Sequence, residues 1–268
     1  MDVNEKLAKL ESYLESLDSL AVAFSGGVDS SFLLKIAHTL LGDKVLAVII
    51  NSSTFPQREL EDALELVNDL EVNYRIIEAE NINIEGFADN PRNRCYLCKR
   101  DLFSHVWPVA RDNNIKWVAD GSNFDDINDY RPGMMAIKEL GVISPLLEAG
   151  LRKADIRALS KRMQLKSWDK PAAACLASRF SYGQRISLER LKMVEAGEDF
   201  LLELGFKQVR VRVHENLARI EVDPAERHKF YNDKIMDQIS DKFKELGFPY
   251  SSLDLAGYRT GSMNENID

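Results

Sequence analysis

The residues best suited to chemistry form a short run near the N-terminus, Ser25-Gly-Gly-Val-Asp29-Ser30. The apolar residues 20–24 before it predict a buried strand, and the apolar spacing over 32–40 after it predicts a helix. The two glycines let the backbone approach a ligand closely, and the helix N-terminus favours negative charge. The run therefore predicts an anion site. Its spacing is neither that of the P-loop nor that of the dinucleotide-binding motif. The alternative to an anion site is a glycine turn that only packs the strand against the helix.

Three cysteines form a second candidate centre. Cys95 and Cys98 are separated by two residues, and Cys175 lies far along the chain. Structural zinc usually takes four Cys or His ligands, and the histidines show no matching spacing. A thioredoxin-type redox pair would begin a helix in a βαβ context that is not evident here. Three thiolates with one position left open suit a [4Fe–4S] cluster. The alternative is three ordinary cysteines, although neighbouring basic residues favour the thiolate form of the first two.

A third candidate site lies in the last third of the chain. Arginines alternate with valines over 209–214, so a strand there would carry Arg210 and Arg212 on one face. Two parallel guanidinium groups suit a phosphate or a carboxylate. The alternative is a solvated ladder in which these arginines pair with Glu221 on the next strand.

Composition limits the class of protein. The chain has 268 residues, of which 45% are hydrophobic, and a net charge of −8. A dedicated nucleic-acid binder usually has a basic surface, so this charge favours a small-molecule substrate and no nucleic acid. The first residues do not read as a signal peptide, and no apolar run approaches the length of a membrane span. Three cysteines are not a disulfide framework. We therefore expect a cytoplasmic protein without a membrane partner.

The spacing of apolar residues predicts the elements that position these groups. Strands are expected over 20–24, 44–50, 72–78, 117–121 and 142–143, and helices over 5–17, 59–70, 101–112, 134–140 and 152–163. This alternation predicts right-handed βαβ units and a parallel sheet, which binds ligands at the carboxyl ends of its strands. The loop over 122–133, rich in Asp and Asn, follows one such end and is either functional or plain turn chemistry.

The pattern changes in the last part of the chain. Helices are expected over 188–204 and 233–246, and strands over 208–214, 217–222 and 251–255. This is a small α+β arrangement. We therefore predict an α/β domain over residues 1–184 and a smaller α+β domain over 185–268.

Ser25-Gly-Gly-Val-Asp29-Ser30 resembles the S-G-G-x-D-S loop of PP-loop ATP pyrophosphatases, which adenylate a substrate and release pyrophosphate. With the loop over 120–133 and the segments 175–183, 209–214 and 254–261, the chain resembles the LarE family over nearly its whole length. The resemblance implies a PP-loop domain followed by a domain for substrate binding and oligomerisation, in a cytoplasmic homohexamer. It implies an enzyme that adenylates a carboxylate of pyridinium-3,5-biscarboxylic acid mononucleotide. The product would be a thiocarboxylate for the nickel-pincer cofactor of lactate racemase.

The resemblance also implies roles for individual residues. The expected nucleotide-binding residues are Ser25, Gly26, Gly27, Asp29, Ser30, Ser52, Gly121, Asp129 and Arg131. The expected catalytic residues are Asp29, Cys95, Cys98, Cys175 and Arg179, and the substrate would bind Arg210, Arg212 and Arg259. ATP chemistry calls for Mg²⁺, for which Asp29 is the first candidate. Glu198 and Glu221 fall where family members bind a divalent metal, but a further family aspartate has no counterpart in Lys229-Phe-Tyr231.

The source of sulfur divides the family. In one branch a single cysteine, matched here by Cys175, gives up its sulfur and becomes dehydroalanine. In another, three cysteines hold a [4Fe–4S] cluster that relays added sulfide. Cys95 and Cys98 place this chain with the cluster branch, and sacrifice of Cys175 is the alternative.

Other enzyme classes share parts of this pattern. A tRNA thiolase joins the same loop to a C-x-x-C pair, but would show a basic face and extra zinc-binding or RNA-binding modules. An amidotransferase-coupled synthetase of the NAD or GMP type shares the loop, but gives the three cysteines no joint role. A nucleotide-binding module without catalysis leaves the thiols unexplained.

Overall fold

The computed structural model describes residues 2–128, 133–171 and 174–259. The chain folds into two compact units, and each is described here by itself. The first consists of Met1–Ile84 and Asn93–Ala173, and the second of Glu85–Arg92 and Ala174–Asp268. The domain boundary expected near residue 184 stays a prediction.

A sheet of four parallel strands forms the centre of the first unit, in the order β3-β2-β1-β4. These strands are β1 (Leu20–Phe24), β2 (Val45–Asn51), β3 (Asn73–Glu78) and β4 (Trp117–Ala119). Leu20 at the start of β1 pairs with Val45 on one side and Trp117 on the other. The parallel sheet confirms the predicted α/β fold.

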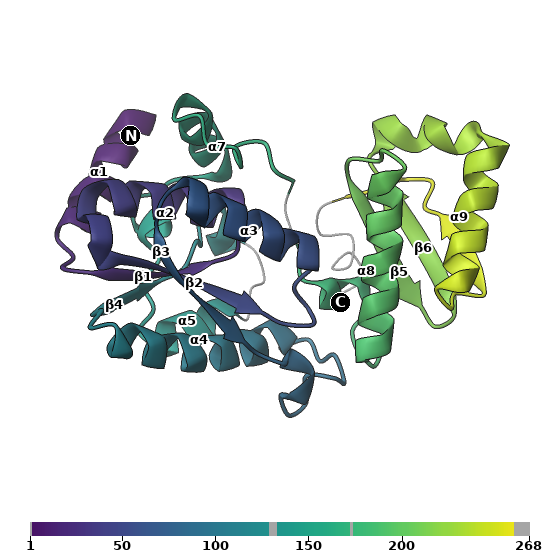
Figure 1. Cartoon of the computed structure of the whole chain (residues 1–268), viewed down its shortest axis with the longest axis horizontal. Coiled ribbons are helices and arrows are strands. Elements are labelled where there is room, and N and C mark those ends of the chain that lie inside the picture. Colours follow the sequence, from purple (N-terminus) through teal and green to yellow (C-terminus); the bar gives the residue numbers. More distant parts are fainter. Residues whose placement is uncertain (1, 129–132, 172–173, 260–268) are drawn as a thin grey trace. The chain divides into compact units, whose positions relative to one another are not determined.

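Helices cover both faces of this sheet (Figure 1). On one face lie α1 (Val3–Glu15), α2 (Val28–Leu41), α3 (Gln57–Asp69) and α7 (Lys153–Arg162), and on the other lie α4 (Arg94–Asp112) and α5 (Gly133–Glu139). The short α6 (Pro145–Glu148) packs against α1 and α2. Leu20 and Val22 of β1 point into the core beneath α2, whereas Ala21 belongs to the core beneath α4. Burial on both faces explains why β1 is apolar throughout.

The second unit is a small three-stranded sheet with two helices. β5 (Val209–His214) pairs antiparallel with β6 (Leu217–Val222), and β6 pairs parallel with β7 (Tyr250–Leu253). The helices are α8 (Leu188–Glu203) and α9 (Asp233–Glu245). A Cβ added at Gly197 of α8 would lie 3.1 Å from the Phe243 ring of α9 and 3.6 Å from Val211. Gly197 therefore lets α8 pack closely on Val211 of β5 and on Phe243 of α9.

The segment Glu85–Arg92 joins the second unit through hydrogen bonds that sequence patterns do not predict. Asn90 Nδ2 donates to the carbonyl oxygens of Phe180 (3.2 Å) and Ser181 (2.7 Å), and Gly183 N donates to Asn90 O (2.9 Å). Asn90 is fully buried and has a positive φ of 52°. This backbone conformation is one that Asn tolerates better than most residues.

The remaining helical segments are short 3₁₀ helices. They span Gly42–Lys44, Asn81–Asn83, Phe124–Asn128, Leu176–Arg179 and Pro224–Tyr231. Within residues 2–128, 133–171 and 174–259, no helix combines the length and the apolar character needed to cross a bilayer.

Candidate active site

The predicted anion site is the junction between β1 and α2. Gly26 has a φ of 65°, and a Cβ added there would lie 3.0 Å from Cβ of Ala63 on α3. Both facts favour glycine at this position. Gly27 is the N-cap residue of α2 and provides no side-chain cap. The N–H groups of the first turn are therefore available for an anion at the positive end of the helix.

Hydroxyl groups and a second loop complete this junction. The Oγ atoms of Ser25 and Ser30 lie 3.2 Å apart, and Ser30 Oγ donates to Gly27 O at 3.1 Å. A Cβ added at Gly121, just beyond the end of β4, would lie 3.1 Å from Ser30 N. The structure therefore brings Ser25, Gly27, Ser30 and Gly121 together, as a nucleotide site requires.

Asp29, in the first turn of α2, forms an ion pair that the sequence does not predict. Lys153, the first residue of α7, donates from Nζ to Asp29 Oδ2 at 2.6 Å. Burial raises the pKa of Asp29 above its ordinary value, Lys153 opposes this rise, and the nearby Asp126 carboxylate adds to it. Asp29 Oδ1 is buried and has no partner at ordinary hydrogen-bond geometry among the described residues, although the Asn123 side chain lies close enough to help lower the pKa of this carboxyl. A carboxylate oxygen held in this way beside a phosphate site fits Mg²⁺.

At the same edge of the sheet, the ends of β2 and β3 lie beside a cysteine of α4. Asn81, which follows β3, is buried and donates from Nδ2 to Thr54 Oγ1 (2.6 Å) and Ser52 Oγ (3.4 Å). The same nitrogen lies 3.5 Å from Cys98 Sγ, within hydrogen-bonding range for sulfur. Ser52 was predicted to bind the nucleotide, whereas no sequence signal marked Asn81. A thiol therefore lies beside a predicted nucleotide residue.

Lys99 connects α4 with the end of β4. Its Nζ lies 3.3 Å from Asp120 Oδ2, and Asp120 Oδ1 accepts from Ser144 Oγ at 2.7 Å. The alkyl chain of Lys99 packs closely on Gly133. Together with Lys153, this residue places positive charge at the carboxyl edge of the sheet. The predicted nucleotide residues Asp129 and Arg131 lie outside the described residues.

None of the three cysteines forms a disulfide. Cys95 and Cys98 lie three residues apart at the start of α4 and so share one side of that helix. Cys95 and Cys175 are exposed, and Cys98 is partly buried. Cys175 belongs to the second unit. Among the described residues, no three Cys, His, Asp or Glu side chains already form a metal-binding group. Thiol sulfur is the usual donor to an iron–sulfur cluster, so the chemistry of these three side chains fits such a group.

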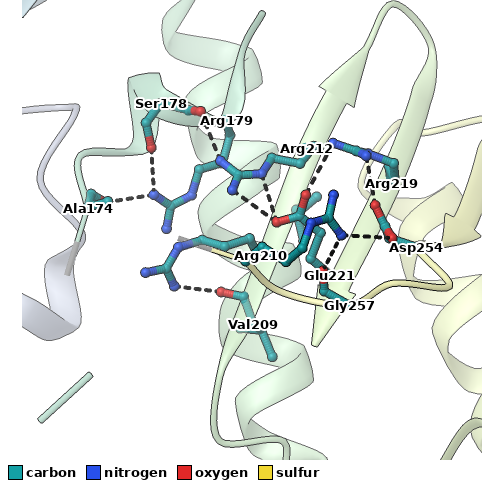
Figure 2. A network of polar contacts seen from close by, with 12 residues as sticks. Ala174, Ser178, Arg179, Val209, Arg210, Arg212, Arg219, Glu221, Asp254 and Gly257 are labelled. Atoms are coloured by element: carbon teal, nitrogen blue, oxygen red, sulfur yellow. Dashed lines mark hydrogen bonds and ion pairs between the residues drawn. The ribbon is translucent and has the colours of Figure 1, made fainter. Parts of the chain in front are cut away.

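In the second unit, Arg179 and Glu198 form a buried, two-armed ion pair (Figure 2 shows Arg179). Arg179 Nε and Nη2 donate to the two oxygens of Glu198, each at 2.8 Å. Arg179 Nη1 also donates to Ala174 O at 2.7 Å and Cys175 O at 3.2 Å. Burial alone would raise the pKa of Glu198, but Arg179, with smaller contributions from Arg210 and the Val211 N–H, lowers the pKa below its ordinary value. Arg179 thus fixes the backbone around Cys175.

Neutralising Glu198 is expected to destabilise the protein most at neutral pH. Folding lowers the pKa of Glu198, so the ion pair stabilises the folded protein at pH values above the pKa of Glu198 in the unfolded chain. This stabilisation is lost as the pH falls through the lower pKa of the folded state. Glu198→Gln should lower the free energy of unfolding by about 3–5 kcal/mol at pH 7, and the loss should shrink below about pH 4. Urea unfolding at both pH values measures this. The control Glu189→Gln, on the exposed start of the same helix, should change little. A loss of unfolding free energy that is the same at both pH values would contradict the assignment of Glu198 as the ionised partner of Arg179.

Two of the predicted substrate arginines, Arg210 and Arg212, are buried, and Figure 2 shows their contacts. Arg210 Nη1 donates to Val209 O at 2.7 Å, and its guanidinium lies 5.2 Å from the centre of the Tyr258 ring. Burial and the adjacent Arg179 lower the pKa of Arg210 to about 10, so it stays charged at neutral pH. Arg212 Nη2 donates to Glu221 Oε2 at 2.9 Å. Arg212 does pair with Glu221, but both side chains are buried, so the ladder is not solvated.

The full-length comparison identifies the family. The chain is 38% identical over 265 residues to the pyridinium-3,5-bisthiocarboxylic acid mononucleotide synthase of Lactiplantibacillus plantarum, across 98% of this chain and 95% of that protein. The chain belongs to the LarE family. An uncharacterized protein of Synechocystis sp. is 39% identical to this LarE-family chain, over 98% of each protein. An uncharacterized protein of Methanocaldococcus jannaschii is 30% identical, over 96% of this chain and 98% of that protein.

More distant matches concern the nucleotide chemistry. The family model for NAD synthase matches residues 3–94 of the LarE-family chain, a range that contains Ser25–Ser30. GMP synthase of Shewanella frigidimarina is 25% identical over 171 residues, which are 55% of this chain and 32% of that enzyme. These matches confirm the prediction of an ATP-dependent PP-loop enzyme. The LarE relative, unlike GMP synthase, matches the chain almost from end to end.

Proposed function

We propose that this enzyme transfers sulfur to pyridinium-3,5-biscarboxylic acid mononucleotide on the way to the nickel-pincer cofactor of lactate racemase. The observation that carries the proposal is Cys98, whose sulfur shares the Asn81 amide with Ser52 at the nucleotide edge of the sheet. Sulfur transfer to an adenylated carboxylate needs a sulfur centre beside the nucleotide, whereas an amide-forming synthetase does not. The name of the L. plantarum relative, a bisthiocarboxylic acid mononucleotide synthase, supports the same substrate.

The first step is adenylation. A carboxylate oxygen of the substrate attacks the α-phosphorus of ATP, and the bond from that phosphorus to pyrophosphate breaks. The start of α2 and the Ser25 and Ser30 hydroxyls would bind the departing pyrophosphate, and Lys153 would add positive charge. Asp29 would hold Mg²⁺, which when bound supplies charge neutralisation. AMP then makes the carboxylate oxygen a leaving group.

The second step replaces oxygen by sulfur. A sulfur nucleophile attacks the acyl carbon, the bond to AMP breaks, and a thiocarboxylate remains after the sulfur separates from its carrier. Cys95, Cys98 and Cys175 would hold a [4Fe–4S] cluster, which when bound supplies a coordination position for added sulfide. Sacrifice of the Cys175 sulfur is the competing route. A homohexamer in the cytoplasm is expected from the family resemblance.

Arg210 and Arg212 would bind the phosphate of the mononucleotide. Arg210→Ala should raise the KM for the mononucleotide by about ten- to a hundredfold, because a charge-assisted pair contributes roughly 1.5–3 kcal/mol. The KM for ATP should stay unchanged. Steady-state kinetics with each substrate varied in turn measures both values. An equal rise in both KM values would show general damage, and no rise would place Arg210 outside the substrate site.

Oxygen labelling tests the proposed adenylation. If a substrate carboxylate attacks ATP, one carboxylate oxygen ends in AMP when sulfur displaces it. We expect ¹⁸O from the labelled mononucleotide in the phosphate of AMP, with one pyrophosphate released per AMP. Release of ADP and phosphate, or AMP that carries only oxygen from water, would overturn the proposal.

A further inference from the structure

A ladder of alternating charges runs through the second unit, from β5 across β6 to the C-terminal segment (Figure 2). Arg212 binds Glu221 Oε2 at 2.9 Å, and Arg219 Nη2 lies 3.1 Å from the other oxygen, Oε1. Arg219 Nη1 donates to Asp254 Oδ2 at 2.7 Å. The other oxygen of Asp254, Oδ1, lies 3.8 Å from Arg259 Nη1. Glu221 thus joins two arginines, with one oxygen for each, whereas Asp254 binds Arg219 closely through Oδ2 and lies farther from Arg259, because its Oδ1 also accepts from Ala256 N at 2.8 Å.

We propose that Arg219 is a positioning residue, which orients the two predicted substrate arginines at the ends of this ladder, Arg212 and Arg259, through Glu221 and Asp254. Arg219 itself lies between the two carboxylates, one η nitrogen on each (Figure 2). This inference rests on the proposed function, because it assumes that Arg212 and Arg259 bind the mononucleotide.

Burial explains why this arrangement matters. Glu221 is fully buried, and Arg212 is only 5% exposed, so solvent screens their interaction weakly. A guanidinium has five N–H donors in a fixed plane, and Glu221 together with the Ser178 carbonyl, which accepts from Arg212 Nη1 at 3.0 Å, fixes the plane in which the Arg212 donors lie. Three arginines against two carboxylates also leave the ladder with one net positive charge. An anion therefore meets donors that are oriented before it binds.

The ladder also changes the interpretation of Glu221. The family resemblance implies a divalent metal at Glu198 and Glu221. A carboxylate binds a metal ion through an oxygen lone pair that points at the metal rather than at an arginine. Both oxygens of Glu221 face guanidinium groups, and both oxygens of Glu198 face Arg179. In this chain, arginine occupies the cation positions around these carboxylates.

Kinetics of Arg219→Met test the proposal. We expect the KM for the mononucleotide to rise roughly 10- to 100-fold, as for other residues that orient a ligand-binding group, with the KM for ATP unchanged. Arg219→Lys, which keeps the charge but loses the two-armed bridge, should recover only part of the loss. The matched control is Arg185→Met, an exposed arginine of the same unit, which should leave both values unchanged. If Arg219→Met does not fold, the same kinetics can be measured on Asp254→Asn, which weakens the same ladder.

A double variant shows whether Arg219 acts through Arg212. Because the two residues share Glu221, the KM increase of Arg212→Met/Arg219→Met should be smaller than the product of the single increases. Increases that simply multiply would overturn the positioning role. If Arg212→Met alone leaves the KM unchanged, the proposed substrate site fails, and with it this role.

Metal binding gives a readout that does not depend on activity. Titration with Mn²⁺ in the absence of nucleotide, followed by electron paramagnetic resonance, should find the same number of bound ions in the wild type and in Glu221→Gln. Loss of a bound ion in Glu221→Gln would show that Glu221 is a metal ligand, and would overturn the ladder as its role.

Discussion

Asp29→Ala and Ser30→Ala are each expected to reduce pyrophosphate release by about 10²–10³-fold, the loss seen when one fixed group that stabilises developing charge is removed. Asp29 carries the buried oxygen suited to Mg²⁺, and Ser30 Oγ lies between Gly27 O and Ser25 Oγ at the start of α2. Both changes remove groups from the place where charge accumulates as pyrophosphate departs. A coupled assay of pyrophosphate with saturating ATP and mononucleotide measures the rate.

The fold should survive these changes. The Asp29–Lys153 pair is partly exposed, with side-chain exposures of 20% and 34%, and such pairs contribute at most about 1 kcal/mol. The melting temperature should therefore change little. Asp43→Ala, at an exposed position just after α2, is the matched control. Pyrophosphate release at the wild-type rate in either variant would remove this loop from the mechanism.

Cys95→Ala, Cys98→Ala and Cys175→Ala are each expected to abolish repeated sulfur transfer. If the three thiols hold one cluster, removal of any of them should lose iron and activity together, since two thiolates hold a cluster poorly. Anaerobic reconstitution, iron analysis and product counting with ATP and sulfide measure this. The wild type should make many products per chain. Asp29→Ala is the control that should keep its iron while it loses adenylation.

Sacrifice of Cys175 gives a different pattern. Product would then stop at about one per chain, position 175 would become dehydroalanine, and the protein would lose the mass of H₂S. Cys95→Ala and Cys98→Ala would still complete this single turnover. Dehydroalanine at position 175 in sulfide-fed, anaerobic protein would contradict the cluster proposal.

Much of the fold follows from local pattern. The apolar run over 20–24 is β1, and the valine–arginine alternation over 209–214 is β5. The start of α4 is the main difference. The sequence predicted a helix from Asp101, but α4 begins at Arg94, with Asn93 as its N-cap, and so includes the C-x-x-C pair. Polar residues and cysteines gave this turn no apolar periodicity, so the pattern did not show it.

The candidate site was predictable in its parts but not in its pairings. The loop Ser25–Ser30 has a local signature, so its place at the edge of the sheet followed from the βαβ pattern. Lys153 lies 124 residues from Asp29, and Asn81 becomes relevant only because α4 brings Cys98 beside it. The pairing of Glu221 with Arg212 was the alternative to a substrate site and assumed a solvated ladder, whereas the structure buries this pair. Contacts of this kind depend on tertiary packing, which residue spacing does not encode.

The mass of the mononucleotide after reaction tests the central claim most directly. The purified, reconstituted enzyme would be incubated anaerobically with ATP, Mg²⁺, sulfide and pyridinium-3,5-biscarboxylic acid mononucleotide, and the small molecules analysed by mass spectrometry. We expect a product in which sulfur has replaced a carboxylate oxygen, with AMP and pyrophosphate formed in equal amounts and nothing formed without ATP. A mononucleotide that keeps all its oxygen while ATP is consumed, or that carries an amide nitrogen when ammonia is supplied, would contradict the assignment of this chain as a sulfur transferase.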